Sequence, residues 1–297
     1  MIVSAPASSA NLGPGFDCLG LAVDLPFELA DEHPAGERWL TAEATHPATV
    51  AFVAAGGDPA LGLWWRSPVP PGRGLGFSGA ARVAGAYLAG RLDELGHAPA
   101  RDAASLLASE LEGHADNAVA SSLGGFTVAA GGSSVSFPVP DGLELVVWWP
   151  ERSTSTDASR RVLPATVPLE DAAFSIARSA LWVAAIAAGE TSWLREACQD
   201  RVHQPGRLAA RADSAGALEH LLGHEAVVAA WLSGSGPTVA ALVADSTDTS
   251  ELTAGLPADG RSRRLGLAAQ RHTIQSLAAQ RIGDIVEAVG DGQEGVT

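Results

Sequence analysis

The sequence contains no lysine, so all 19 of its basic side chains are arginine. This absence excludes every mechanism that requires a lysine amine. A Walker A phosphate loop and a protein kinase both use a lysine to contact nucleotide phosphates. Schiff-base and pyridoxal chemistry use the lysine amine itself as the nucleophile. Any chemistry that the protein performs must therefore depend on other groups.

Cations are few, since 19 Lys plus Arg against 34 Asp plus Glu give a formal charge of −15. Nucleic acid and anionic membrane surfaces are not expected as partners, because clustered cations recognise both. Two cysteines, Cys18 and Cys198, are too few for a disulfide scaffold or a cysteine-based zinc site. The longest apolar run, Ala180 to Ala188, is about half of the roughly 20 residues that span a membrane. With no signal-peptide pattern either, we expect a soluble, cytoplasmic protein.

Apolar sequence is plentiful, because 46% of the 297 residues are hydrophobic, and this length accommodates two domains. Periodicity and Gly/Pro breaks predict strands and helices without strict βαβ alternation, which favours an α+β fold. The expected strands are residues 1–7, 20–29, 62–67, 117–130, 135–149 and 239–244, with another around Trp231. The expected helices are residues 77–95, 103–113, 167–200 and 205–224, with breaks at Gly189 and Gly206.

A glycine-rich segment, Pro68 to Ala81 (PVPPGRGLGFSGAA), directly precedes the first predicted helix. Glycine allows positive φ and close backbone approach, so successive N–H groups can face one concavity. The helix adds its free N–H groups and the positive end of its dipole. Together these features indicate a phosphate site, with an ordinary loop as the alternative. The hydroxyl of Ser78 is placed to reach a magnesium ion.

Three further segments concentrate polar residues or glycine beside predicted strands. Glu110 to Gly125 carries Glu112, His114, Asp116 and Asn117, which suit either a magnesium and substrate site or a capped helix end. Leu232 to Thr238 (LSGSGPT) holds more glycine than a hairpin needs. Asn11 to Asp17 (NLGPGFD) is either a turn or a loop that presents an amide and a carboxylate to a small polar substrate.

These four segments, in this order, resemble the GHMP kinase superfamily and most closely its homoserine kinase family. Pro6 to Val23 is similar to the start of those kinases, and Pro70 to Gly76 (PPGRGLG) resembles their phosphate loop. Glu112 to Phe126 is similar to a stretch characteristic of homoserine kinases, and Ser233 to Thr238 resembles the third superfamily motif. The match extends, with gaps, from about residue 2 to about residue 244.

The resemblance implies a two-domain GHMP kinase fold with the active site between the domains. Residues 1–145 would form a ribosomal-protein-S5-like domain that holds the phosphate loop, and residues 146–297 a ferredoxin-like domain. The implied reaction transfers the γ-phosphoryl group of ATP to the hydroxyl of L-homoserine, in threonine biosynthesis. Catalysis would depend on positioning and charge rather than on a dedicated base, which a lysine-free chain can supply.

The resemblance also implies roles for individual residues. ATP would contact Pro71, Gly72, Arg73, Gly74, Leu75, Gly76, Ser78, Gly79, Gly234 and Gly236. Mg²⁺ would be held by Ser78 and Glu112. The substrate pocket would comprise Asn11, Asp17, His114, Asp116, Asn117, Thr156, Arg160 and Arg207. Two arginines suit one substrate carboxylate, because a guanidinium binds it through two parallel hydrogen bonds.

The sequence departs from the family pattern at Phe77 and Gly79, where the usual loop GLGSSAA has serine and alanine. Residues 48–60 lack the asparagine-containing segment that helps to seat adenine in relatives. Two alternatives therefore stay open: a GHMP kinase for another small hydroxy acid, and a catalytically silent ligand-binding protein. The tryptophan pairs Trp64–Trp65 and Trp148–Trp149 also leave a homodimer open. One ring of each pair would face outward from a strand, where an exposed tryptophan can form a contact between subunits.

Overall fold

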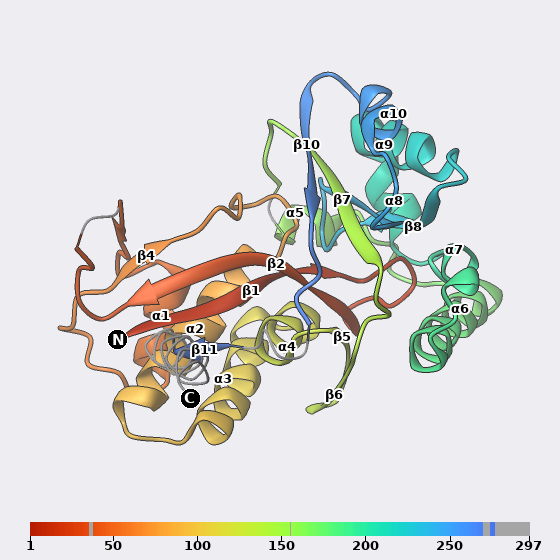
Figure 1. Ribbon diagram of the computed structural model, residues 1–297. Coiled ribbons are helices and arrows are strands. Elements are labelled where there is room, and N and C mark those ends of the chain that lie inside the picture. Colours follow the sequence, from red (N-terminus) through yellow and green to blue (C-terminus); the bar gives the residue numbers. More distant parts are fainter. Residues whose placement is uncertain (36–37, 155, 270–273, 277–297) are drawn as a thin grey trace, which may run out of the picture.

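The computed structural model describes residues 1–35, 38–154, 156–269 and 274–276, and its strands form two antiparallel sheets (Figure 1). The larger sheet has the order β11-β1-β2-β4-β3, with β5 also paired to β2 and β6 paired to β5. Its strands are β1 (Ile2–Ala10), β2 (Leu19–Ala30), β3 (Leu40–Thr41), β4 (Trp64–Arg66), β5 (Phe126–Ala130), β6 (Ser133–Phe137) and β11 (Gln275–Ser276).

The smaller sheet has the order β10-β7-β9-β8. Its strands are β7 (Leu143–Pro150), β8 (Val227–Leu232), β9 (Val239–Ala244) and β10 (Gly260–Leu265). Because every described pairing in both sheets is antiparallel, the predicted α+β class is confirmed. The chain enters the smaller sheet at Leu143 and returns to β1 of the larger sheet at β11. The domain boundary between residues 145 and 146 stays a prediction.

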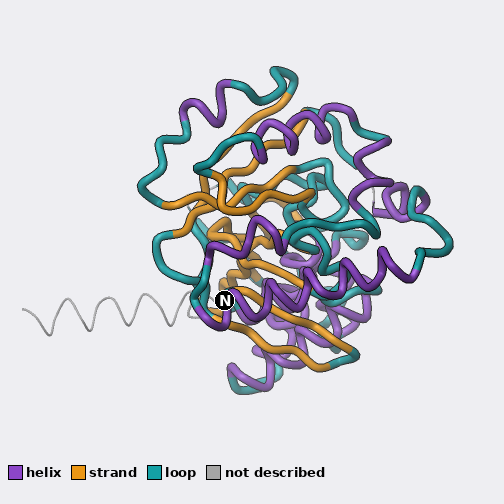
Figure 2. The backbone as a smooth tube through the Cα atoms, turned by 90° about the vertical axis from the view of Figure 1, so that its right-hand side faces the viewer, coloured by secondary structure: helices purple, strands orange, loops and turns teal. Residues whose placement is uncertain are grey.

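Helices cover the outer faces of the sheets, while the strands run through the middle of the molecule (Figures 1 and 2). The larger sheet packs against α2 and α4, which in turn contact α1 and α3. The helices are α1 (Pro47–Ala54), α2 (Phe77–Leu92), α3 (His97–Glu112), α4 (Asp116–Leu123), α5 (Thr156–Arg161), α6 (Leu169–Ala188), α7 (Leu194–Ala197), α8 (Gln204–Ala209), α9 (Ala212–Leu222) and α10 (Ser250–Ala254).

A shared core joins the inner faces of the two sheets. Leu21 of β2 and Leu242 of β9 belong to the same buried cluster. Trp182 of α6 stacks on Phe126 of β5 with ring centroids 6.0 Å apart, and packs edge-on against Trp231 of β8 at 5.8 Å. Burial of such rings contributes about 2–3 kcal/mol each relative to exposure. The polar loops at the ends of β1 and β8 are therefore held close together.

Two segments predicted as strands are wrong in part. The range 135–149 is two strands, β6 and β7, which lie in different sheets, and residues 117–123 of the range 117–130 belong to the helix α4. Seven of its eight residues are buried, and most are small, such as Ala118 and Ala120. A short helix that is buried on all sides has no apolar stripe, so periodicity cannot distinguish it from a buried strand. The predicted break at Gly206 is also wrong, since Gly206 lies inside α8 and the chain turns at Ala210 and Arg211.

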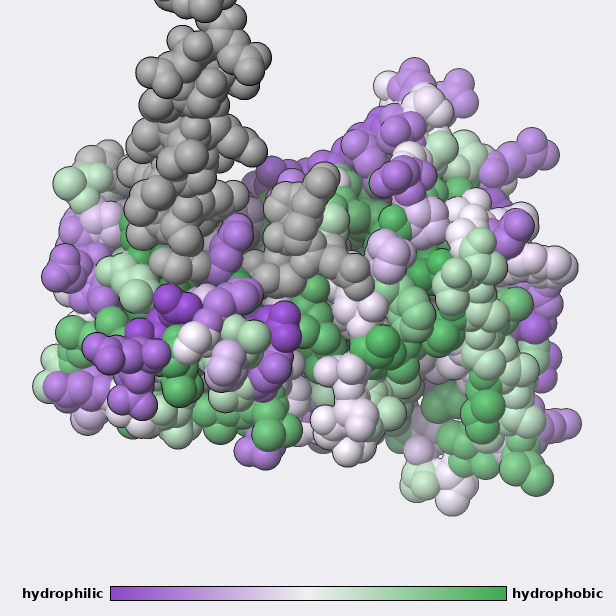
Figure 3. Space-filling view, turned by 60° about the horizontal axis from the view of Figure 1, so that its bottom comes forward, coloured by the Kyte–Doolittle hydropathy of each residue, from purple (hydrophilic) through white to green (hydrophobic). Residues whose placement is uncertain are grey.

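Among the described residues, one helix, α6, has the length and apolar composition of a membrane span, with 22% of its apolar window buried. Its inward face packs through Trp182, Ala185 and Ile186 on the core shared by the sheets. Leu169 and Ile176 are 85% and 69% exposed on its outer face. Hydrophobic side chains gather on the right of the face drawn in Figure 3, the side on which α6 lies in Figure 1.

Candidate active site

A cavity of about 250 Å³ opens where the glycine-rich loop, the end of α3, the start of α4 and the loops after β1 and β8 converge. Thirteen of the residues predicted from the sequence line it. They are Asn11, Asp17, Gly72, Gly74, Gly76, Ser78, Glu112, His114, Asp116, Asn117, Arg160, Arg207 and Gly234. Phe77, Thr154 and Ser235 also line the cavity and were not predicted as site residues.

The glycine loop requires its glycines for both conformation and space. Gly72, Gly74 and Gly76 have φ of +66°, +79° and +67°, which side chains rarely adopt. A Cβ at Gly74 would lie 2.4 Å from the Ser233 carbonyl oxygen, and one at Gly76 would lie 2.0 Å from Ser8 Oγ. The main chain of the loop is therefore pressed against β1 and the turn after β8, with its other side on the cavity.

Helix α2 starts at Phe77 without a side-chain cap, and its first turn carries no acidic residue. The N–H groups of this turn have no acceptor within the helix. Together with the positive end of the dipole of a 16-residue helix, they form a site for an anion. Gly76 and Ser78, on either side of the helix start, both line the cavity.

The turn after β8 supports this loop. Ser233 Oγ donates to the Gly74 carbonyl at 2.6 Å, and the Thr238 amide donates to the Arg73 carbonyl at 3.3 Å. The two glycine-rich segments predicted from the sequence therefore lie against each other. Gly234, in the same turn, borders the cavity.

Six predicted residues are not among those that line the cavity. Leu75 is buried in the core, Arg73 donates to the Glu151 carbonyl, and Gly79 packs closely on Asn117. Their places indicate that they support the loop. The other three are Pro71, Gly236 and Thr156, and the side chain of Thr156 lies outside the described part of the chain.

Phe77 borders the cavity with its ring held in an aromatic cluster. The ring meets Trp65 edge-on at 5.4 Å between centroids, and packs in the same way on Phe27 and His46. Burial lowers the pKa of His46 to about 4, so this imidazole is neutral at pH 7. An apolar wall therefore stands beside the first turn of α2, where the family pattern has serine.

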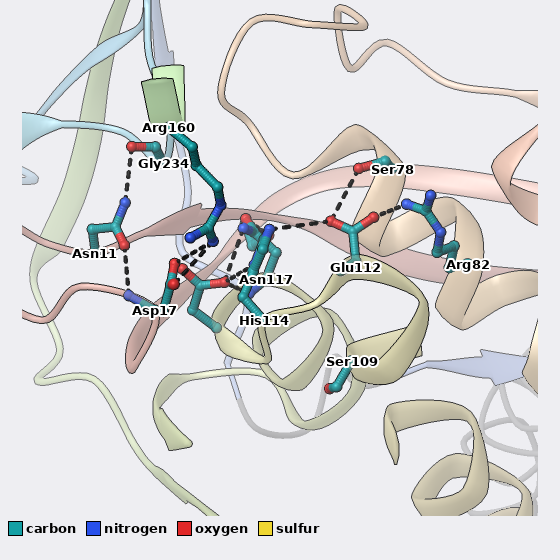
Figure 4. Close-up of polar contacts among 12 residues, drawn as sticks. Asn11, Asp17, Ser78, Arg82, Ser109, Glu112, His114, Asn117, Arg160 and Gly234 are labelled. Atoms are coloured by element: carbon teal, nitrogen blue, oxygen red, sulfur yellow. Dashed lines mark hydrogen bonds and ion pairs between the residues drawn. The ribbon is translucent and has the colours of Figure 1, made fainter. Parts of the chain in front are cut away.

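Two oxygen-bearing side chains face each other at the other side of this turn. Ser78 Oγ donates to Glu112 Oε2 at 3.2 Å, and His114 Nε2 lies 3.8 Å from the same oxygen (Figure 4). Hydroxyl and carboxylate oxygens are the ligands that Mg²⁺ prefers, so the pair predicted from the sequence fits this metal. The other carboxylate oxygen, Oε1, is paired with Arg82, which the sequence analysis did not single out.

Asp17 and Arg160 meet across the opposite wall of the cavity. Arg160 NH2 lies 2.9 Å from each oxygen of Asp17 (Figure 4). Asn11 positions this loop, because its Nδ2 donates to the Gly234 carbonyl at 2.8 Å and its Oδ1 accepts from the Asp17 amide at 3.0 Å. Asn11 and Asp17 have φ of +70° and +55°, a strained conformation that recurs at functional sites.

His114, Asp116 and Asn117 form a connected polar group at the start of α4. His114 Nδ1 donates to Asp116 Oδ1 at 2.7 Å, and the Asn117 amide donates to the same oxygen at 2.8 Å. Burial acts to lower the pKa of His114, but Asp116 and Asp17 outweigh it, so the pKa is raised. Ligand atoms of Asp17, His114 and Asp116 lie within 4.8 Å of one another, which makes them a second candidate cation site.

Arg207 approaches the cavity from α8 and is 2% exposed. Its NH1 lies 3.0 Å from the Gly234 carbonyl and 3.1 Å from His203 Nδ1, and burial lowers the pKa of Arg207 to about 10. The ring of Phe16 lies against the guanidinium groups of both Arg207 and Arg160, at 5.3 and 5.5 Å. Sequence reasoning missed Phe16, although it lies next to Asp17 in the predicted substrate loop.

No protein-family model matches the chain. A homoserine kinase of Thermus thermophilus is 40% identical over 251 residues, covering 80% of this chain and 85% of that protein. A homoserine kinase of Streptomyces coelicolor is 38% identical over 300 residues, 93% of this chain and 94% of that protein. The crystal structure of homoserine kinase from Cytophaga hutchinsonii has a TM-score of 0.76 and 23% identity, covering 93% of this chain and 97% of that one. The chain therefore belongs to the homoserine kinase family of the GHMP kinases.

Proposed function

We propose that this protein is an ATP-dependent kinase that phosphorylates the hydroxyl of L-homoserine to give O-phospho-L-homoserine. Family membership supports the proposal. The observation that carries it is a single cavity in which the main chain of the glycine loop lies opposite Arg160, Arg207, Asp17 and Asp116. A triphosphate and a small zwitterion with a hydroxyl require groups of these kinds within reach of each other.

In this proposal the phosphates of ATP lie on the main chain of residues 72–76 and on the first turn of α2. The N–H groups there are fixed by the fold, so they need no reorganisation when charge develops on the transferred phosphoryl group. Ser78 and Glu112 hold Mg²⁺, which neutralises negative charge on the phosphates when it is bound. No lysine is needed for this arrangement.

The amino acid occupies the opposite wall. Arg160 and Arg207 bind its carboxylate, while Asp116 and Asp17 attract its ammonium group. Asn11 and Asp17 lie near the hydroxyl, and His114 and Asn117 hold Asp116 in place. The hydroxyl is thereby directed at the phosphoryl group, and the protein contributes positioning and charge rather than a dedicated base.

A coupled ADP-release assay tests the proposal with homoserine, threonine and mevalonate as acceptors. Turnover with homoserine alone is expected. Faster turnover with mevalonate or threonine would instead identify a kinase of another hydroxy acid. Absence of turnover with all three, combined with a raised unfolding temperature in homoserine or ATP, would identify a silent ligand-binding protein.

We also propose a cytoplasmic location, on the basis of two free cysteines and a pathway of soluble metabolites. Residues 1–145 and 146–297 are the proposed domains, with the cavity where they meet. A homodimer stays a prediction, and size-exclusion chromatography with light scattering tests it directly.

A further inference from the structure

Arg82 lies one helical turn after Ser78 on α2, on the side of Glu112 that faces away from the cavity. Figure 4 shows Glu112 between Arg82 on one side and Ser78 and His114 on the other. Arg82 NH1 is paired with Glu112 Oε1, while Ser78 and His114 approach Oε2. The two oxygens of one carboxylate therefore have different partners: a fixed cation, and the proposed metal site.

The pair is largely shielded from water, since the side chains of Arg82 and Glu112 are 21% and 7% exposed. Within the described residues, Arg82 makes no other ion pair, and its Nε atom is buried without a hydrogen-bond partner. The charge of Arg82 is thus directed at Glu112. Because both groups are largely buried, salt screens the interaction less than it screens an exposed ion pair.

We propose that Arg82 is the resident counter-ion of Glu112, and that it makes uptake of the divalent cation depend on the nucleotide. This inference rests on the proposed metal role of Ser78 and Glu112. With Arg82 in place, the charge of the Glu112 carboxylate is already balanced, so this ligand attracts a divalent cation that arrives alone only weakly. The phosphates of ATP supply the negative charge that the site lacks, so metal and nucleotide bind together.

Arg82 would weaken metal binding, whereas the groups that usually contact a metal ligand from outside the site strengthen it. Such partners are commonly acceptors or anions, which increase the basicity of the ligand and strengthen metal binding. Arg82 is a cation, so it offsets the charge of the carboxylate and repels the metal. Even at the dielectric constant of bulk water, about 80, repulsion between Arg82 and a divalent cation about 5 Å away corresponds to roughly tenfold or more in affinity.

The experiment measures Mn²⁺ binding by electron paramagnetic resonance, with and without a non-hydrolysable ATP analogue. The central variant is Arg82→Gln, which loses the charge but keeps an amide donor near Glu112. Arg82→Lys is the matched control, because it keeps the charge, and Arg82→Met is a second neutral variant. The unfolding temperature of each variant without metal shows that it is folded.

Without nucleotide, Arg82→Gln is expected to bind Mn²⁺ at least about tenfold more tightly than the wild type, and Arg82→Lys to match the wild type. The increase in Mn²⁺ affinity caused by the analogue should also be smaller in Arg82→Gln. Equal or weaker binding in both neutral variants would overturn the counter-ion role. Unchanged binding in Glu112→Gln with the analogue would instead overturn the proposed metal site itself.

Discussion

The two walls of the cavity are formed by different parts of the residues, one mostly by main-chain atoms and the other by charged side chains. The proposed nucleotide wall is mostly main chain, in which glycines at positive φ press against Ser8 and Ser233. The proposed substrate wall consists of charged side chains carried by α4, α5, α8 and the loop after β1. The main-chain part of a wall is weakened only by a steric change, whereas a wall of charged side chains can be weakened one charge at a time. Substitutions should therefore have different consequences on the two sides.

The largest effect is expected from Gly74→Ala. The new Cβ would lie 2.4 Å from the Ser233 carbonyl oxygen, in a backbone conformation with φ +79°. Strain and overpacking together should lower the free energy of unfolding by about 3 kcal/mol and abolish turnover. The matched control is Gly131→Ala, which has φ +56° but open space around it, and which should cost about 1 kcal/mol and remain active. Urea denaturation and the ADP-release assay would make the comparison, and equal losses in both variants would contradict it.

The second prediction concerns one charge of the substrate wall. Arg160→Ala should raise the homoserine KM by roughly 100-fold and leave the ATP KM within about threefold, because one charged hydrogen-bonded contact is lost. Its neighbour Arg161, exposed at the end of the same short helix, supplies the control variant Arg161→Ala. Steady-state kinetics with each substrate varied in turn would measure both constants. An equal rise in the two KM values would show that the walls are not separate.

A smaller effect is expected from Phe16→Leu. The ring lies about equally far from the guanidinium groups of Arg160 and Arg207, at 5.5 and 5.3 Å. Loss of both contacts should raise the homoserine KM by about tenfold, since each contributes about 0.5–1 kcal/mol. Phe174→Leu is a matched control, because that ring contacts Arg178 and Arg201 instead. Unchanged homoserine kinetics in Phe16→Leu would mean that the arginines hold their positions without the ring.

The smallest effect concerns the aromatic cluster beside the nucleotide wall. Burial lowers the pKa of His46 to about 4, so the folded state disfavours its charged form. The contribution is complete above the unfolded pKa of about 6.5, and it is lost as the pH falls toward 4. Between pH 7 and pH 5 the wild type should lose about 1 kcal/mol more stability than His46→Asn, which can still cap α1. Denaturation at the two pH values gives the difference, and identical losses would contradict it.

Much of the nucleotide wall could be predicted from the sequence, because glycine spacing before a helix is a local signal. Gly72, Gly74 and Gly76 line the cavity, and the helix begins at the predicted residue, Phe77. The supporting role of Arg73 could not be predicted, since it depends on the Glu151 carbonyl, 78 positions away.

The polar residues of Asn11–Asp17 and Glu110–Gly125 indicated part of the substrate wall, whereas Arg160 and Arg207 were located by resemblance. The organisation of this wall is tertiary. The sequence around Phe16 gives no sign that its ring contacts two arginines from other segments. Arg82 carried a weak signal, since it follows Ser78 by four residues and shares a helix face with it, but Glu112 comes from a different helix. The prediction of a strand where α4 lies has the same origin, because a helix buried on all sides shows no helical periodicity of apolar residues.

A crystal structure with a non-hydrolysable ATP analogue, Mg²⁺ and L-homoserine tests the central claim most directly, that one cavity joins a main-chain phosphate wall to a charged amino-acid wall. We expect the triphosphate on residues 72–76 and the first turn of α2, and the homoserine carboxylate on Arg160 and Arg207 with its hydroxyl toward the terminal phosphate. A nucleotide bound elsewhere, or a homoserine carboxylate that contacts neither arginine, would contradict the account.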